Sequence, residues 1–270
     1  MPQAISFNSA IHYEVIDAVA PASTDPATVL FIHGIGAHRA IWRDWLPHLI
    51  GGYRVVSFDL RGYGLSRESA PDFQWCLRNL AADAIAVADA VGPGPVHLVG
   101  ESIGGTIALE AAIGFPDRCA SITVSNGGHV GSSIERVRAW DEQIRTGGIK
   151  AWSDDFMQQR FHPGALSPRQ RAWYGKVQEA WEHASIMNLL TVLVGTDLRP
   201  RLGEIACPVL ILHPDDSPFI PVEIAVDLYR RLQRAQLQVI AGSRHGMPYS
   251  HSRECAVALR KFLDHLPPPA

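Results

Sequence analysis

A serine between glycines stands out in the segment GESIGG, residues 100–105. The apolar run VHLVG before it (96–100) is typical of a buried strand, and GGTIALEAAIGF after it (104–115) is typical of a helix. A Gly-x-Ser-x-Gly turn between strand and helix is strained and makes its serine protrude, and the helix N-terminus favours negative charge nearby. We therefore predict that Ser102 is a nucleophile. The alternative is an ordinary hydroxyl in a glycine-rich turn.

A serine nucleophile needs a neighbouring base that takes its proton. His245 lies in a loop that follows the apolar run 237–242 and leads into the C-terminal helical segment. The histidine therefore comes after the serine, which is the chain order that such turns use. We predict that His245 is the base, the alternative being a surface or core histidine.

The attacked carbonyl oxygen becomes negative and needs preorganised N–H donors. The turn His-Gly-Ile-Gly, residues 33–36, directly follows an apolar run and can present the N–H of Ile35. The N–H of Ile103, next to the nucleophile, would supply a second donor. We interpret His33 as a residue that holds this turn.

These residues need a scaffold of strands and helices. Short apolar runs alternate along the chain with helical patterns such as 77–91 and 222–235, which predicts an α/β fold with a mostly parallel, doubly wound sheet. Residues 3–17 could add an antiparallel hairpin at one edge. The predicted strands are 28–33, 53–59, 96–100, 121–125, 208–213 and 237–242.

One stretch interrupts the alternation, because helical patches replace strands between about residues 127 and 195. We predict a core formed by residues 1–127 and 196–270, with a helical cap at 128–195. Four of the seven tryptophans fall in this cap, where they could pack it onto the core or line an apolar substrate pocket.

We assign Gly34, Trp140 and Met247 to substrate contacts. Three cap arginines are either solvated helix charges or a clamp for a substrate carboxylate. They are Arg136, Arg138 and Arg160.

The composition narrows the choice of partners. A net charge of −3 and an isoelectric point near 6.4 give no reason to expect nucleic acid or an anionic membrane. The N-terminus lacks a signal-peptide pattern and no apolar run is long enough to cross a membrane, so we expect a cytoplasmic protein. The four cysteines are widely spaced, which favours reduced thiols. The histidines lack metal-binding spacing, so we expect no metal.

At this point the chain resembles the α/β-hydrolase superfamily along nearly its whole length. The segments VLFIHGIG, YRVVSFDLRGYGLS and CPVLILHPDDSPFIP look like its successive strand-turn signatures, in the right order. The cap segment RAWDEQIRTGGIKAWSDDFMQQRF is most similar to the 3-oxoadipate enol-lactonase and carboxylesterase branch. The resemblance implies ester or lactone hydrolysis on a small molecule, with no cofactor.

The acid that should orient His245 departs from the family pattern. The family places an aspartate at the position of Ser217, and two carboxylates precede it at Asp215 and Asp216. Three interpretations stay open: a shifted loop brings Asp216, or alternatively Asp215, to His245; Asn126 orients the histidine; or His245 has no strong partner.

We therefore predict a serine hydrolase that forms an acyl-enzyme on Ser102 from a small or medium ester or lactone. Two alternatives remain. Carbon–carbon hydrolases of vinylogous diketones, the meta-cleavage products, share this cap and triad. A weakly catalytic ligand-binding protein on the same fold is the other, and the serine at position 217 motivates it.

Overall fold

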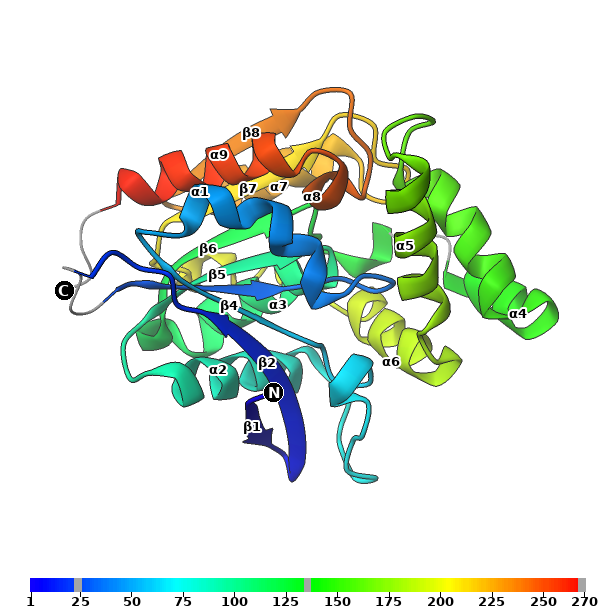
Figure 1. Cartoon of the computed structure of the whole chain (residues 1–270), viewed down its shortest axis with the longest axis horizontal. Coiled ribbons are helices and arrows are strands. Elements are labelled where there is room, and N and C mark those ends of the chain that lie inside the picture. Colours follow the sequence, from blue (N-terminus) through cyan, green and yellow to red (C-terminus); the bar gives the residue numbers. More distant parts are fainter. Residues whose placement is uncertain (22–25, 134–136, 267–270) are drawn as a thin grey trace.

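A computed structural model describes residues 1–21, 26–133 and 137–266 of the chain. Its centre is an eight-stranded sheet in the order β1-β2-β4-β3-β5-β6-β7-β8 (Figure 1). The first two strands form an antiparallel edge hairpin and β3 to β8 run parallel, which confirms the mostly parallel sheet. The strands are β1 (Gln3–Ser6), β2 (Ser9–Ile16), β3 (Thr28–Ile32), β4 (Arg54–Phe58), β5 (Val96–Glu101), β6 (Cys119–Ser125), β7 (Val209–Pro214) and β8 (Ala235–Ile240).

The central strands are short runs whose side chains are all buried, as in β3 and β7. A parallel strand covered by helices on both faces buries both sets of side chains, so a continuous apolar run identifies it. The last strand differs from the prediction. It begins at Ala235, two residues earlier than expected, and only Ile240 of its six residues is buried, because β8 is the edge of the sheet.

Helices cover both faces of the sheet and define two buried clusters. Side chains of α2, α3 and α7 pack against one face, and those of α1 and α9 pack against the other (Figure 1). The helices of the core are α1 (Leu46–Leu49), α2 (Leu77–Val91), α3 (Ile103–Gly114), α7 (Val222–Arg231), α8 (Met247–Ser250) and α9 (Ser252–Asp264).

A helical insert, defined as α4 (Val137–Arg160), α5 (Pro168–Glu179) and α6 (His183–Val194), separates β6 from β7. The insert lies beyond the end of the sheet where β5 meets α3 (Figure 1). Gly148, with φ 75°, interrupts α4, and a capping box between Ser167 and Gln170 starts α5. None of the described helices is long and apolar enough to cross a membrane.

Candidate active site

Ser102 lies in a tight turn between β5 and α3, with φ 55° and ψ −122°. This backbone conformation is strained for a side chain with a Cβ atom. The flanking glycines make the turn possible: a Cβ atom on Gly100 would lie 2.0 Å from the Gly104 oxygen, and one on Gly104 would lie 2.3 Å from the Ile32 oxygen. The strained turn places the Ser102 hydroxyl at the end of the sheet.

His245 lies against this hydroxyl. Its Nε2 is 3.1 Å from Ser102 Oγ, and the side chains come from segments 143 residues apart. Burial lowers the pKa of His245 well below its ordinary value, and the positive charge of Arg160 and the nearby His213 lower it further. The imidazole is therefore neutral near pH 7, which is the form that can accept a proton.

Among the described residues, His245 Nδ1 is buried without a hydrogen-bond partner. The structure does not bring either predicted aspartate to it. Asp215 accepts hydrogen bonds from the N–H groups of Gly242 (2.8 Å) and Ser243 (2.9 Å). Asp216 is bound to Arg244 at 3.0 Å and lies 3.4 Å from His162. The aspartates thus hold the loop before His245 and not its ring.

Asn126, the other candidate, and Ser217, at the expected acid position, form hydrogen bonds with backbone groups. The Ser217 hydroxyl accepts from the N–H groups of Phe219 (3.4 Å) and Ile220 (3.2 Å), within its own turn. The Asn126 amide donates to the carbonyl of His245 at 2.6 Å. Asn126 therefore fixes the main chain of the histidine loop, while the geometry leaves the imidazole Nδ1 to neither residue.

The turn with Ile35 packs directly on the nucleophile, since a Cβ atom on Gly34 would lie 2.9 Å from Ser102 Cβ. His33 Nδ1 donates to the Gly34 carbonyl at 2.9 Å, and its Nε2 accepts from the Leu60 N–H at 3.0 Å. Burial lowers the pKa of His33 to about 4, so the ring stays neutral in this tautomer. Because a trans peptide points its C=O and N–H in opposite directions, His33 also sets the direction of the Ile35 N–H.

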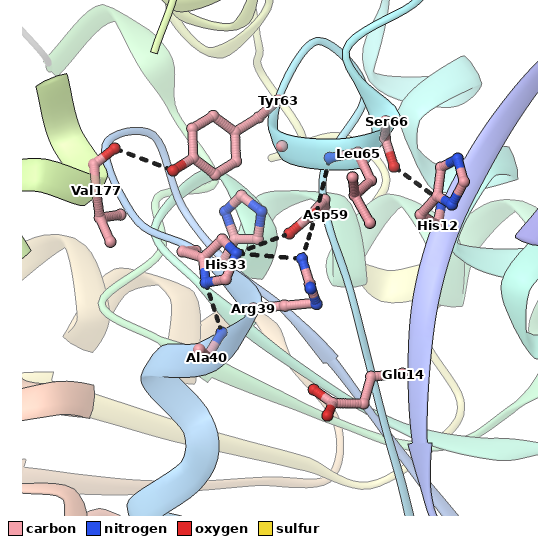
Figure 2. Close-up of polar contacts among 12 residues, drawn as sticks. His12, Glu14, His33, Arg39, Ala40, Asp59, Tyr63, Leu65, Ser66 and Val177 are labelled. Atoms are coloured by element: carbon pink, nitrogen blue, oxygen red, sulfur yellow. Dashed lines mark hydrogen bonds and ion pairs between the residues drawn. The ribbon is translucent and has the colours of Figure 1, made fainter. Parts of the chain in front are cut away.

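The loop after β4 contacts this turn through the Leu60 N–H, and it is itself fixed by further hydrogen bonds. Figure 2 shows Asp59, which is fully buried and accepts from Arg39 and from the Leu65 N–H. Figure 2 also shows the hydroxyl of Tyr63, which donates to the Val177 carbonyl on α5 at 3.0 Å. The same loop is thus fixed to the core at Asp59 and to the helical insert at Tyr63.

Three aromatic side chains form a continuous set next to His245. The ring of Phe219 lies 4.8 Å from the His245 ring, and the rings of Trp140 and Phe156 lie 5.4 Å and 5.2 Å from that of Phe219. The ring of Phe219 thus lies in contact with both Trp140 and His245. Met247 differs from its assignment to substrate contact: it is fully buried in the cluster under α9.

The sequence patterns assign no role to Glu101, and they leave Arg160 as a solvated charge or a substrate clamp. Both side chains are fully buried and face each other at 3.3 Å. Burial raises the pKa of Glu101, while the guanidinium of Arg160 and the Gly34 N–H oppose that rise. The two residues are 59 positions apart in the sequence, so no local sequence pattern predicts their ion pair. Arg136 and the side chain of Arg138 lie outside the described residues.

Within the described ranges, no group of three or more His, Cys, Asp or Glu side chains could hold a metal ion. The site itself offers a serine hydroxyl, a neutral imidazole and backbone N–H groups. These are the nucleophile, the base and the hydrogen-bond donors that attack on a carbonyl carbon requires.

Comparison with known proteins agrees with this geometry. The profile of the alpha/beta hydrolase family matches residues 29–258, so the chain belongs to that family. Among curated relatives, "Putative carbamate hydrolase RutD" of Caulobacter segnis is 29% identical, covering 87% of this chain and 91% of that protein. A 2-hydroxy-6-oxononadienedioate/2-hydroxy-6-oxononatrienedioate hydrolase of Paraburkholderia xenovorans is 25% identical, covering 88% and 87%.

Solved structures show the same fold. The enol-lactonase of Burkholderia xenovorans superposes with a TM-score of 0.88 at 18% identity, covering 98% of this chain and 100% of that one. An esterase from Exiguobacterium antarcticum gives 0.86 at 20% identity, covering 97% and 98%. At these identities the likeness establishes the α/β-hydrolase fold, including the helical insert.

Proposed function

We propose that this protein is a serine hydrolase that cleaves a small or medium carboxylic ester or lactone. The observation that carries the proposal is the 3.1 Å contact between His245 Nε2 and the hydroxyl of Ser102, at a strained turn between strand and helix. Such a pair, with a neutral base, is the arrangement that activates a serine nucleophile.

The reaction follows from the placement of these groups. Ser102 Oγ attacks the carbonyl carbon while His245 takes its proton, and the N–H groups of Ile35 and Ile103 hold the negative oxygen. The first N–H groups of a helix have no partner inside the helix, which leaves that of Ile103 at the start of α3 for this purpose. The imidazolium then protonates the leaving alcohol, and water releases the acyl group by the same route.

The Nδ1 of His245, to which no described residue forms a hydrogen bond, bears on the rate. A carboxylate at this nitrogen stabilises the imidazolium and fixes the tautomer, and its loss from a triad costs on the order of 10⁴ in turnover. We therefore expect a slow hydrolase, in which Asp216 acts through the loop and not as the third member of a triad.

The substrate class is inferred from the walls of the site. Trp140, Phe156 and Phe219 supply apolar aromatic surface beside His245, which favours an uncharged acyl group. The buried pairing of Arg160 with Glu101 supports this choice, because it neutralises a cation that could otherwise select a carboxylate. In this proposal the helical insert covers the site as a cap.

The test is hydrolysis of a panel of p-nitrophenyl esters and lactones by the wild type and by Ser102→Ala. We expect release of p-nitrophenolate by the wild type, and a loss of at least about 10³-fold in Ser102→Ala. A fluorophosphonate probe should label the wild type at Ser102 and not label His245→Ala at a comparable rate. Full activity in Ser102→Ala would contradict the proposal.

A second candidate is hydrolysis of a carbon–carbon bond in a vinylogous diketone. The specific observation in its favour is the 25% identity to the Paraburkholderia xenovorans hydrolase of 2-hydroxy-6-oxononadienedioate. A loss of the yellow absorbance of such a compound in the presence of the enzyme would support it. Unchanged absorbance of several such compounds, together with ester cleavage, would exclude carbon–carbon hydrolysis and retain the ester hydrolase.

A further inference from the structure

The turn at residues 33–36, which we call the oxyanion turn, contains three consecutive peptide groups. A different side chain forms a hydrogen bond with each of them. The Gly34 N–H donates to Glu101 Oε2 at 2.8 Å. The Gly34 carbonyl accepts from His33 Nδ1 at 2.9 Å. The Ile35 carbonyl accepts from Arg160 Nη2 at 2.7 Å. The peptide that carries the Ile35 N–H therefore lies between two others, each fixed by one partner of a buried ion pair.

Arg160 is the last residue of α4, so this partner belongs to the helical insert and not to the sheet. Its guanidinium is fully buried and also contacts the Tyr174 hydroxyl on α5. Its carbonyl accepts from the Gly246 N–H at 2.9 Å, beside His245. One residue of the insert thus contacts the residue before the nucleophile, the oxyanion turn and the histidine loop.

The local packing shows that this contact is close on every side. A Cβ atom on Gly246 would lie 2.2 Å from the Phe161 ring and 2.7 Å from Arg160 Cγ. A second residue of the insert, Trp181, donates from its indole N–H to the Ala37 carbonyl at 3.1 Å. The insert therefore binds the oxyanion turn at Ile35 and the chain just after it at Ala37.

We propose that Arg160, paired with Glu101, is a positioning residue that orients the oxyanion turn, so that docking of the helical insert completes the oxyanion hole. The inference rests on the proposed hydrolase function. It assigns the insert a part in stabilising the transition state as well as in covering the substrate. Arg160 suits this role because a planar guanidinium can bind Glu101, Tyr174 and the Ile35 carbonyl together, whereas a lysine ammonium is a single point charge.

The consequence is kinetic. An N–H that is misdirected by a fraction of an ångström stabilises the negative oxygen poorly, while the substrate in its ground state binds as before. Loss of Arg160 should therefore lower kcat by about 100-fold and leave KM nearly unchanged. A residue with a merely structural role would lower the yield or the melting temperature and leave kcat of the folded protein alone.

The test is the double variant Glu101→Gln with Arg160→Met. Removing one partner alone would strand a buried charge, whereas this double variant is neutral, and the amide that replaces the Glu101 carboxylate can still accept from the Gly34 N–H. The matched control is Arg201→Met with Glu110→Gln, which removes another arginine–carboxylate pair, 3.2 Å apart, whose buried carboxylate lies on α3 eight residues after Ser102. Arg160→Lys, which keeps the charge, is the second variant if the double variant fails to fold.

Each protein is assayed with a p-nitrophenyl ester, with a boronic acid that mimics the tetrahedral intermediate, and by thermal unfolding. We expect the site double variant, or Arg160→Lys in its place, to lose about 100-fold in kcat and a similar factor in boronic acid affinity, with KM unchanged. The Arg201 control should retain kcat. Wild-type kcat in the folded site variant, or a change in KM alone, would overturn the proposal.

The two proposals fail in distinguishable ways. If wild-type Ser102 neither cleaves esters nor reacts with a fluorophosphonate, the hydrolase function fails, and the positioning role falls with it. If the wild type reacts and the folded site variant reacts equally fast, only the positioning role fails.

Discussion

Ser217 occupies the position at which the resembling family carries its acid, and its hydroxyl is used inside its own turn. We expect Ser217→Asp to raise kcat at least about tenfold, because a carboxylate facing His245 Nδ1 would stabilise the imidazolium formed during attack. Steady-state ester hydrolysis measures this. Asp216→Asn is the companion variant: it should change kcat less than about threefold, and a drop on the order of 10³ or more would show that Asp216 is the acid after all.

The same histidine predicts a pH profile. Burial, with Arg160 and His213, lowers the pKa of His245, so protonation of the base should begin only below the ordinary histidine pKa of about 6.5. We expect kcat/KM of the wild type to fall only on the acid side of that ordinary value, as the base becomes protonated. In Ser217→Asp the new carboxylate favours the imidazolium, so the fall should begin at a higher pH. Coincident profiles for the two proteins would contradict this account.

At the scale of elements, the strand–turn–helix unit around Ser102 depends on two close backbone approaches. A Cβ atom on Gly104 would lie 2.3 Å from the Ile32 oxygen, and backbone cannot move aside as a side chain can. We therefore expect Gly104→Ala to destabilise the protein by about 1–3 kcal/mol or more, measured by urea unfolding, and to lower ester hydrolysis.

Gly175 offers the matched control, because it lies inside α5 and no described residue comes within 4 Å of an added Cβ atom. The same substitution there should stabilise by about 0.5–1 kcal/mol, since alanine favours a helix interior. Equal effects at the two glycines would contradict the importance of the close approach at the turn.

The elements were predictable because their patterns are local. The run at β7 is mostly apolar and buried throughout, helix α2 begins and ends at the predicted residues 77 and 91, and the edge hairpin formed as expected. The serine–histidine contact was predictable too, because the carboxyl ends of parallel strands meet at one edge of the sheet.

The partners of charged side chains were not predictable in this way. Asp215 and Asp216 were correctly placed in the loop after β7, yet their carboxylates bind the segment from Gly242 to Arg244. Which way a turn directs adjacent side chains depends on contacts with a loop 28 residues away. The pairing of Glu101 with Arg160 depends on how the insert docks, which no periodicity encodes.

At the scale of the whole molecule, buried neutral histidines should make stability depend on acidity. Burial lowers the pKa of His97, on β5, to about 4, as it does for His33. Between pH 6.5 and 4 the unfolded chain therefore binds protons that the folded chain does not, so the folded state loses stability as the pH falls through this window. Above pH 6.5 none of this stability is lost. At pH 4 the loss amounts to at most about 3 kcal/mol for each histidine, at about 1.36 kcal/mol per pKa unit.

His97→Asn isolates this effect, because an amide can keep the hydrogen bond that the imidazole makes with the Ser121 hydroxyl at 2.8 Å. We expect the free energy of unfolding of this variant, measured in urea at about pH 7, 5.5 and 4.5, to fall less steeply with acidity than that of the wild type. His265→Asn is the control for the replacement of a histidine by asparagine at an exposed position. If His97→Asn and the wild type lose stability in parallel, the buried imidazole at position 97 is not a source of the acid sensitivity.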